Sequence, residues 1–272
     1  MQSLFLSEIF IYPIKSLGGI SVQAAKAEQR GLQYDRRWML VDKNGMFLTQ
    51  REYPQIALLQ VDIKNDRLEV KHKTKTITPL QLPLSNLQNS THSRIAVNIW
   101  DDVVIAKNVS SVADSWFSDA LGFDCRLVFM DNDSIRFTER KYIDELQQVS
   151  FADAYPFLII GQESLNELNR RLKKPLTINR FRPNFVFSGG EPFIEDSWKD
   201  FMIGNLKFCA VKPCSRCVIT TIDPDTAVKE NEPLETLAKF RKVGNKVMFG
   251  MNAIGYDEGM VKVGDRVKIL QT

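Results

Sequence analysis

The chain lacks a long hydrophobic run, a glycine-rich phosphate loop and any abundance of histidine. Without a run of about 18 apolar residues, no membrane-spanning helix is expected. The absence of Gly-x-Gly-x-x-Gly and Gly-x-x-x-x-Gly-Lys-Ser/Thr argues against the common nucleotide-binding folds. The two histidines, His72 and His92, lie in polar contexts typical of exposed turns or strand edges. We therefore expect both to be catalytically idle, which disfavours Ser/His/Asp catalysis.

Charge and targeting signals are also weak. The 36 basic and 33 acidic residues leave a net charge of +3, too small to argue for nucleic acid as a partner. We find no basic stripe and no aromatic platform for single-stranded nucleic acid. The N-terminus lacks the basic start and long apolar stretch of a signal peptide. Four cysteines without that signal predict free thiols in a reducing, cytoplasmic setting, with no membrane partner.

The first half of the chain is typical of β-structure. Apolar stretches are separated by turn residues at regular spacing, which favours a barrel or sandwich. Asn44 and Gly45 are expected to supply the positive φ angles of a tight hairpin turn between flanking strands in 38–48. Two further hairpins are expected: strands 56–63 and 68–71 turning at residues 65–66, and strands 95–100 and 103–106 turning at 101–102.

The first convincing helix spans residues 112–121. Ser111 and Asp114 suggest a capping-box start, and Gly122 follows as a stop. A core-facing stripe is expected from three apolar residues at spacing four, Val112, Trp116 and Ala120, with Ala113, Phe117 and Leu121 beside them.

The second half mixes elements and suggests an α+β, β-rich fold. A strand at 125–130 precedes a polar segment, 131–146, that we expect to be a loop. We place a soft domain boundary near residue 120, which gives one region over 1–120 and another over 121–272. The remaining expected elements are strands at 156–160, 185–187, 201–203, 206–211 and 261–269, and helices at 163–172 and 234–241.

The most informative segment is 212–226, Lys-Pro-Cys-Ser-Arg-Cys-Val-Ile-Thr-Thr-Ile-Asp-Pro-Asp-Thr. It places Cys217 directly before a β-branched run, 218–222, that predicts a strand. Arg216 sits beside this thiol in sequence, and a guanidinium favours the thiolate that attacks electrophiles or binds a soft metal. Half of a zinc site, a thioredoxin-like redox pair and two ordinary thiols in a turn remain alternatives for Cys214 and Cys217. Zinc would need a second ligand pair, and the redox pair a following helix.

Several basic residues lie at strand ends or turns. Arginine presents a planar fork that binds phosphate in two places, so a fold that gathers these residues would make a pocket for an anionic ligand. Arg182 is notable because a proline and a Phe-Val-Phe strand follow it, which suits the mouth of a barrel. The alternative is that each is a solvated surface charge. The residues are Lys15, Arg36, Arg182 and Arg216.

Seven motifs occur together and in order, and jointly they are specific. The chain thereby resembles the MOSC-domain proteins with an N-terminal β-barrel region, a family that includes the mitochondrial amidoxime-reducing component and bacterial counterparts. The resemblance spans residues 4–270 and implies a MOSC-type β-barrel, an N-terminal β-barrel-like region and a few peripheral helices. The motifs are Tyr-Pro-Ile-Lys-Ser at 12–16, Asp-Arg-Arg-Trp at 35–38, Asn-Arg-Phe-Arg-Pro-Asn at 179–184, Asp-Ser-Trp at 196–198, Cys-Ser-Arg-Cys at 214–217 with Thr-Thr-Ile-Asp-Pro-Asp to 225, Pro-Leu-Glu-Thr at 233–236 and Val-Gly-Asp at 263–265.

The resemblance implies a molybdenum cofactor, Mo-molybdopterin, with Cys217 as the catalytic protein ligand to the metal. It also leaves open an association with pyridoxal phosphate. The positions that match the family's contacts to the molybdenum cofactor are Lys15, Ser16, Arg36, Asp153, Arg182, Asn184, Ser215, Arg216 and Asn252.

The chain departs from the family pattern at several positions. Ala154 and Tyr155 replace small hydroxyl residues, so contacts there would pass through the backbone or be lost. Asn252 stands where some relatives carry a tyrosine near the metal, and Ala227 replaces a frequent glycine. The chain has no four-cysteine cluster pattern for an iron–sulfur domain.

The function implied is reduction of N-hydroxylated compounds, a small-molecule substrate class. Electrons would come from a separate, ferredoxin-like or similar protein. Alternatives are a sulfur carrier that uses a Cys217 persulfide, a non-enzymatic carrier of the cofactor, and an interaction domain without metal. Asp223 and Asp225 could shape the substrate entrance, although a turn role suits Asp-Pro-Asp better.

Overall fold

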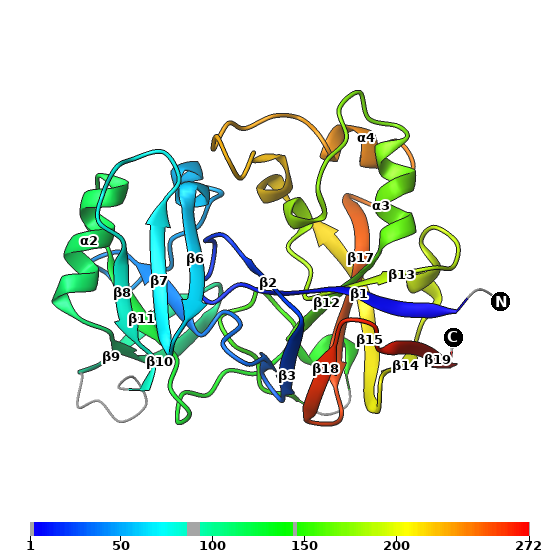
Figure 1. Cartoon of the computed structure of the whole chain (residues 1–272), viewed down its shortest axis with the longest axis horizontal. Coiled ribbons are helices and arrows are strands. Elements are labelled where there is room, and N and C mark those ends of the chain that lie inside the picture. The colour runs from blue at the N-terminus through cyan, green and yellow to red at the C-terminus, as the bar shows by residue number, and fades with distance from the viewer. Residues whose placement is uncertain (1–2, 86–92, 144–145, 272) are drawn as a thin grey trace.

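The computed structural model describes residues 3–85, 93–143 and 146–271, which form two strand-rich lobes (Figure 1). His92 lies outside these residues. One lobe is a closed barrel of seven strands, because β12 pairs with β17 at the ends of the strand order. Both termini of the described chain lie on this lobe. In order around the barrel, the strands are β12 (Phe157–Gly161), β13 (Phe185–Ser188), β1 (Leu4–Ile11), β19 (Arg266–Gln271), β14 (Asp200–Ile203), β15 (Leu206–Arg216) and β17 (Lys246–Gly255).

Aromatic side chains fill the barrel. The rings of Phe157, Phe185 and Phe208 are fully buried, and their centroids lie 5.3–5.5 Å apart. Offset or edge-on aromatic packing at such spacing adds to the free energy gained by burial. The β-rich fold with a MOSC-type barrel is therefore confirmed. Two short strands extend the barrel sheet, β2 (Ile20–Val22) beside β1 and β16 (Lys242–Val243) beside β17.

The second lobe packs two small sheets and a helix around Trp38 and Phe117, both buried. The four-stranded sheet has the order β5 (Trp38–Val41), β11 (Arg126–Phe129), β10 (Asp102–Asn108) and β9 (Arg94–Ile99). The three-stranded sheet contains β6 (Leu59–Lys64), β7 (Arg67–His72) and β8 (Leu80–Pro83), and the helix is α2 (Ser111–Leu121).

Short elements complete the fold. A separate sheet consists of β18 (Gly259–Lys262), β3 (Ala24–Glu28) and β4 (Gly31–Leu32). Within the described residues, no helix has the length and apolar character needed to span a membrane. The peripheral helices are α3 (Gln162–Asn169), α4 (Leu234–Ala238) and the 3₁₀ segments η1 (Pro54–Leu58), η2 (Arg140–Tyr142), η3 (Ile178–Phe181), η4 (Ile194–Ser197) and η5 (Val218–Thr221).

The proposed domain boundary near residue 120 is crossed by strand pairing in both directions. β1, from the N-terminal region, pairs with β13 and β19 of the barrel. β11, from the C-terminal side, pairs with β5 and β10. We keep the boundary as a proposal, with these exchanged strands as the contacts that join the two regions.

Two of the three expected hairpin turns differ in detail. The turn at Asn65 and Asp66 is confirmed, and both residues have positive φ. In the first hairpin only Gly45 has positive φ, because the Asp42 carboxylate holds a longer turn by accepting two backbone N–H groups. In the third, Ile99 pairs with Asp102, so the turn begins one residue earlier, at Trp100.

The start of α2 also lies one residue before the expected cap. The Ser110 hydroxyl accepts the amide of Ala113 at 3.1 Å, so Ser110 is the N-cap. Asp114 instead accepts the amide of Leu127 from β11. The expected core-facing stripe is largely confirmed, because Ala113, Phe117, Ala120 and Leu121 are buried. Val112 is the exception, since it is 70% exposed.

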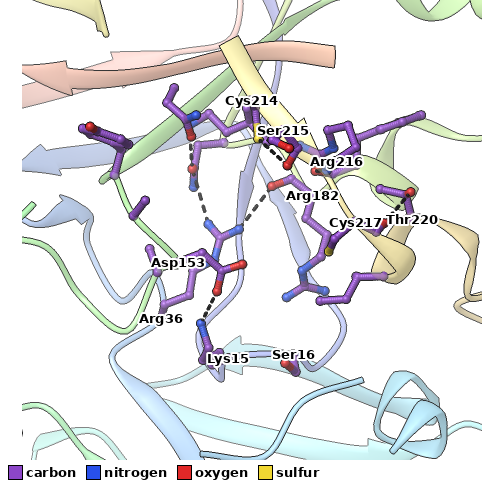
Figure 2. Close-up of a pocket in the computed structure, with 18 of the residues that line it drawn as sticks. Lys15, Ser16, Arg36, Asp153, Arg182, Cys214, Ser215, Arg216, Cys217 and Thr220 are labelled. Carbon is purple, nitrogen blue, oxygen red and sulfur yellow. Dashed lines mark hydrogen bonds and ion pairs between the residues drawn. The ribbon is translucent and has the colours of Figure 1, made fainter. Parts of the chain in front are cut away.

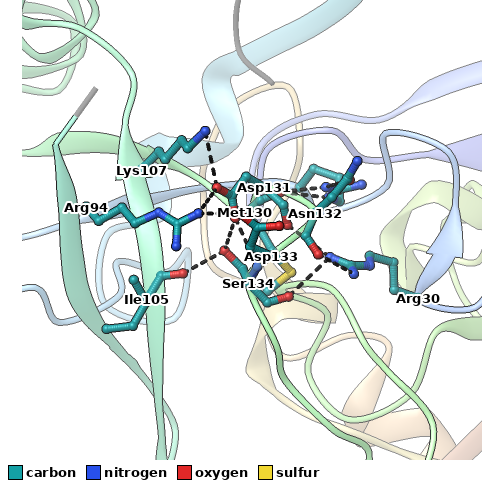
Figure 3. A network of polar contacts seen from close by, with 10 residues as sticks. Arg30, Arg94, Ile105, Lys107, Met130, Asp131, Asn132, Asp133 and Ser134 are labelled. Atoms are coloured by element: carbon teal, nitrogen blue, oxygen red, sulfur yellow. Dashed lines mark hydrogen bonds and ion pairs between the residues drawn. The ribbon is translucent and has the colours of Figure 1, made fainter. Parts of the chain in front are cut away.

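The polar segment after β11 is held by Asp131 (Figure 3). The Asp131 carboxylate accepts hydrogen bonds from Arg94 and Ser134 and lies 3.2 Å from the Lys107 ammonium. Arg30 donates to the carbonyls of Asp131 and Ser134. These contacts fix an otherwise irregular segment and explain how a stretch without apolar periodicity is ordered.

Candidate functional site

Residues from both lobes line one pocket between them, which we call the basic pocket. All ten sequence-predicted site residues contribute to its wall, although they come from six separate stretches of the chain. Figure 2 shows most of their side chains around a common space. The ten are Lys15, Ser16, Arg36, Asp153, Arg182, Asn184, Ser215, Arg216, Cys217 and Asn252.

Lys15 is fixed by the motif that contains it. Its backbone N–H donates to the Trp38 carbonyl, and its ammonium donates to the Phe151 carbonyl at 2.8 Å and to the Asp153 carboxylate at 2.5 Å. Burial lowers the pKa of Lys15 to about 8, although Asp153 opposes that shift. The ammonium is thus a buried positive charge at the base of the pocket.

The two neighbouring arginines of the Asp-Arg-Arg-Trp motif have side chains with different partners. Asp35 is fully buried, accepts the backbone amide of Tyr12 and pairs with the Arg36 guanidinium at 2.6 Å. The Arg37 side chain turns the other way and donates to the Met130 carbonyl. The arrangement leaves Arg36 as the motif residue whose side chain lines the basic pocket.

Arg182 and Asn184 follow η3 at the start of a barrel strand. The Arg182 guanidinium donates to the Leu17 carbonyl at 2.7 Å, and burial together with the charge of Arg36 lowers its pKa to about 10. Asn184 is buried; its side chain donates to the Phe10 carbonyl, while its amide oxygen accepts from Arg36. Asn184 therefore orients Arg36 and joins two strands.

The two cysteines of the Cys-Ser-Arg-Cys segment have different partners from those expected. Arg216 donates to the Cys214 sulfur at 3.0 Å and to the Phe181 carbonyl, so it does not serve Cys217 as its sequence position suggested. Both cysteines are half-buried and free, and both line the basic pocket. β15 ends at Arg216 and η5 begins after Cys217, and the two neighbouring side chains have different partners.

The expected strand at 218–222 is wrong, since Val218–Thr221 form η5 and Ile222 ends it. The hydroxyls of Thr220 and Thr221 donate to the carbonyls of Cys217 and Val218, which favours a tight helical turn over a strand. Cys217 is the residue that caps this turn. Asp223 has the expected turn role, because its carboxylate accepts the backbone amides of Asp225 and Thr226.

Sequence reasoning missed Arg51. Its guanidinium donates to Asp153 at 2.8 Å, lies over the ring of Trp100 and is close enough to Cys217 for a hydrogen bond. Burial alone would lower the pKa of Arg51, but the charges of Asp153 and Cys217 raise it above its ordinary value. The signal in the sequence was slight, because Arg51 follows an ordinary turn and belongs to none of the seven motifs.

The charge balance of the basic pocket favours an anionic ligand. Five cationic side chains line it against one carboxylate among the described lining residues. Two buried donors, Nη2 of Arg182 and Nε of Arg216, have no hydrogen-bond partner in the described structure. Buried unpaired donors are costly and are usually satisfied by ligands or water. A phosphorylated pterin fits these donors, and the nearby sulfur of Cys217 suits a soft metal.

The departures from the family pattern also have places in the structure. Ala154 and Tyr155 line the basic pocket, and the Tyr155 hydroxyl is directed to the Glu139 carbonyl. Asn252 lies on β17 and donates to the Lys212 carbonyl across the barrel sheet.

His72 was expected to be exposed, but it ends β7 and is largely buried. Its ring accepts the backbone amides of Thr74 and Lys75 in the turn that follows.

Comparison with known proteins gives matches along almost the whole chain. The model of the MOSC domain matches residues 147–268, and the model of the MOSC N-terminal beta barrel domain matches residues 3–124. The chain is 32% identical to mitochondrial amidoxime-reducing component 1 of Mus musculus, covering 97% of this chain and 82% of the relative. It is 34% identical to mitochondrial amidoxime reducing component 2 of Bos taurus, with 96% and 82% covered. It is also 30% identical to molybdenum cofactor sulfurase of Oryza sativa subsp. japonica, covering 96% of this chain but 33% of that protein.

Proposed function

This chain belongs to the family of MOSC-domain proteins with an N-terminal MOSC β-barrel domain, and on that premise we propose that it binds the molybdenum cofactor and reduces N-hydroxylated compounds. The names of the mouse and bovine relatives support the activity. The observation that carries the proposal is the basic pocket itself, which is lined by Cys217 and by two arginines that each have a buried, unpaired guanidinium donor.

Each part of the pocket has a distinct task in this proposal. Arg36, Arg182 and Arg216 hold the phosphorylated pterin through charge-assisted hydrogen bonds. Lys15 and Asp153 form the base of the pocket, and their ion pair keeps both groups charged and oriented. Cys217 provides the protein's sulfur ligand to the metal. When bound, the cofactor supplies the two-electron redox chemistry that removes oxygen from nitrogen.

The overall reaction requires an external reductant. An N-hydroxylated substrate, two electrons and two protons give the reduced nitrogen compound and water. We propose a separate electron-transfer protein as the donor, of ferredoxin-like or similar chemistry. The side chains around the pocket bind and orient the reactants, because the redox step itself belongs to the cofactor.

The first test is elemental and pterin analysis of protein purified from a molybdenum-replete host. The proposal expects one molybdenum per chain and turnover of a hydroxylamine or amidoxime with a chemical or protein reductant. Protein that carries neither metal nor pterin under those conditions would contradict it. Bound cofactor without turnover, given any competent donor, would instead favour the carrier alternative.

Cys217→Ser tests the ligand assignment. We expect this variant to lose N-reduction while its thermal unfolding stays close to that of the wild type, because the half-buried sulfur forms no disulfide and its neighbour Arg51 keeps its bond to Asp153. Cys214→Ser is the matched control and should keep most of the activity, since only one sulfur ligand is required. Activity retained in Cys217→Ser would overturn the assignment.

A sulfur-carrier function is the second candidate, favoured by the likeness to the sulfurase of Oryza sativa. Mass spectrometry of the intact protein distinguishes it, because a persulfide adds the mass of one sulfur atom at Cys217 in protein without metal.

A cytoplasmic location and a pyridoxal phosphate association stay predictions. Cell fractionation tests the first, and the absorbance spectrum of the purified protein tests the second.

A further inference from the structure

A second, smaller cavity lies on the other side of Arg182 from the basic pocket. It encloses about 90 Å³ between the barrel and the β6–β7 hairpin region, and we call it the rear cavity. Arg182 and Ile219 line both spaces. Polar side chains from distant parts of the chain form much of its wall, namely Tyr12, Gln50, Gln60 and Arg180.

Three buried donors on residues that line the rear cavity have no hydrogen-bond partner in the described structure, and one of them, Nη2 of Arg182, belongs to the wall shared with the basic pocket. They are the hydroxyl of Tyr12, Nη1 of Arg180 and Nη2 of Arg182. Tyr12 is 1% exposed and Arg180 is 6% exposed, so bulk water does not satisfy them. Native proteins rarely leave buried donors unpaired, and a cluster of three on one cavity indicates a ligand that accepts hydrogen bonds.

The donors are held rigidly. Nη2 of Arg180 pairs with Asp223 at 2.9 Å and with Glu230 at 3.3 Å, which fixes the guanidinium and leaves Nη1 unpaired. Arg182 is anchored in the same way by its bond to the Leu17 carbonyl. Preorganised donors bind a ligand without a large cost in side-chain entropy.

The Tyr12 ring is fixed by its neighbours. The guanidinium carbons of Arg36 and Arg182 each lie 4.3 Å from the ring centroid. Gly19 makes this position available, because a Cβ at residue 19 would lie 2.4 Å from the ring. The tyrosine hydroxyl thus has a set position at the rear cavity.

We propose that the rear cavity is a second oxyanion site, which takes a tetrahedral phosphoryl group. Two guanidinium groups and a hydroxyl are the donors that phosphate prefers, and the fork of arginine suits its geometry. A water molecule occupies about 30 Å³ in the liquid, so the cavity has room for a small oxyanion. The ligand is free phosphate or another small phosphoryl anion, distinct from the phosphorylated pterin that we propose for the basic pocket.

Calorimetric titration of the cofactor-free full chain with inorganic phosphate tests the site independently of the proposed reductase function. The decisive variant is Tyr12→Phe, which removes only the unpaired hydroxyl. We expect its dissociation constant for phosphate to rise roughly tenfold, as for the loss of one hydrogen bond to a charged group. Its melting temperature without phosphate should not fall, because no partner is lost.

Controls separate this site from general anion binding. Tyr53→Phe changes a tyrosine that packs against Phe123 outside the rear cavity and should keep the wild-type affinity. Arg180→Gln should weaken phosphate binding at least as much as Tyr12→Phe, and Arg241→Gln, an ion-paired arginine elsewhere, should not. Absence of phosphate binding by the wild type, or unchanged affinity in both Tyr12→Phe and Arg180→Gln, would overturn the proposal.

The same titration on cofactor-loaded protein distinguishes the rear cavity from the site of the cofactor's own phosphate. Phosphate binding that persists in the loaded protein supports a second site at the rear cavity. Binding that is abolished by loading would show that phosphate had entered the cofactor's own site, and it would overturn the proposal.

Discussion

At the scale of the residue, the basic pocket contains unusual backbone. Ser16, Arg36 and Arg182 have φ angles of 69°, 50° and 55°, in the left-handed region that residues with a Cβ seldom adopt. Each such conformation costs about 1–3 kcal/mol and persists where surrounding contacts enforce it. For Arg36 those contacts are a bond from its own N–H to the Tyr12 carbonyl and one from Phe151 N–H to its carbonyl. The strain directs side chains from three loops into one space.

Arg51 is expected to matter for retention of the cofactor. Arg51→Gln removes a cation that pairs with Asp153 and lies beside Cys217. We expect the variant to release molybdenum at least about tenfold faster on dilution into a chelator, in line with the loss of one charge-assisted bond. Arg171→Gln, which removes a surface pair with Glu167, is the control. Equal release rates for the wild type and Arg51→Gln would show that Arg51 does not hold the site.

The left-handed backbone conformation of Ala227 lowers the free energy of unfolding, and a glycine at this position would remove that penalty. Its φ is 59°, and its amide donates to the Asp223 carbonyl in the turn after η5. We expect Ala227→Gly to raise the free energy of unfolding by about 0.5–1 kcal/mol, the left-handed penalty less the entropy cost of glycine. Denaturant titration measures the change. Ala238→Gly, at the end of α4, should lower stability by about 1 kcal/mol instead; the same sign for both would contradict this explanation.

At the scale of the element, the corner between β15 and η5 decides the chemistry of the pocket. β15 ends at Arg216, and the helical turn η5 begins directly after Cys217. A continued strand would have placed successive side chains on opposite faces of the barrel. The corner instead leaves Cys214 beside Arg216 and brings Cys217 near Arg51.

The cap of α2 provides a test at this scale. Ser110→Ala should lower the free energy of unfolding by about 1 kcal/mol, because the helix loses the side chain that accepts the Ala113 amide. Ser111→Ala changes the first helical residue and should stay within about 0.5 kcal/mol of the wild type. The reverse order of effects would restore Ser111 as the cap.

At the scale of the whole molecule, one ion-paired cluster joins the lobes at the basic pocket. Asp153, just before the barrel strand β12, pairs with Lys15 and Arg51 from the N-terminal part of the chain. Burial alone would raise the pKa of Asp153, but the charges of Lys15 and Arg51 and their hydrogen bonds hold it well below its usual range. The carboxylate is 51% exposed, so water screens part of this attraction.

The cluster predicts a pH-dependent contribution to stability. The Asp153 pKa is lower in the folded chain, so the carboxylate stabilises the fold above its unfolded pKa of about 3.9 and loses this effect as pH falls through the folded pKa. Asp153→Asn should therefore lower stability by about 1 kcal/mol at pH 7, and the difference from the wild type should shrink in strong acid. Asp133→Asn, whose partner Arg94 keeps Asp131, is the control. A difference that stays constant down to strong acid would contradict the mechanism.

The sequence by itself determined the β-rich class, most strand positions and, through its resemblance to a known family, ten of the residues that line the basic pocket. These follow from local patterns and from motifs that keep their spacing, and the expected ten residues do line one space. Tertiary structure decided the pairings. Arg51 lies 166 residues from Cys217 in sequence, and Tyr12 lies 168 residues from Arg180, so only tertiary contacts bring either pair to a shared cavity. For Arg51 and Cys217 the contact is between the lobes, and for Tyr12 and Arg180 it is the pairing of β1 with β13. Because Arg216 and Cys217 are adjacent in sequence, we expected the arginine to be the partner of that thiol. The observed partners are Cys214 for Arg216 and Arg51 for Cys217. Where the backbone turns, the direction of each side chain depends on tertiary contacts, which a local sequence pattern does not contain.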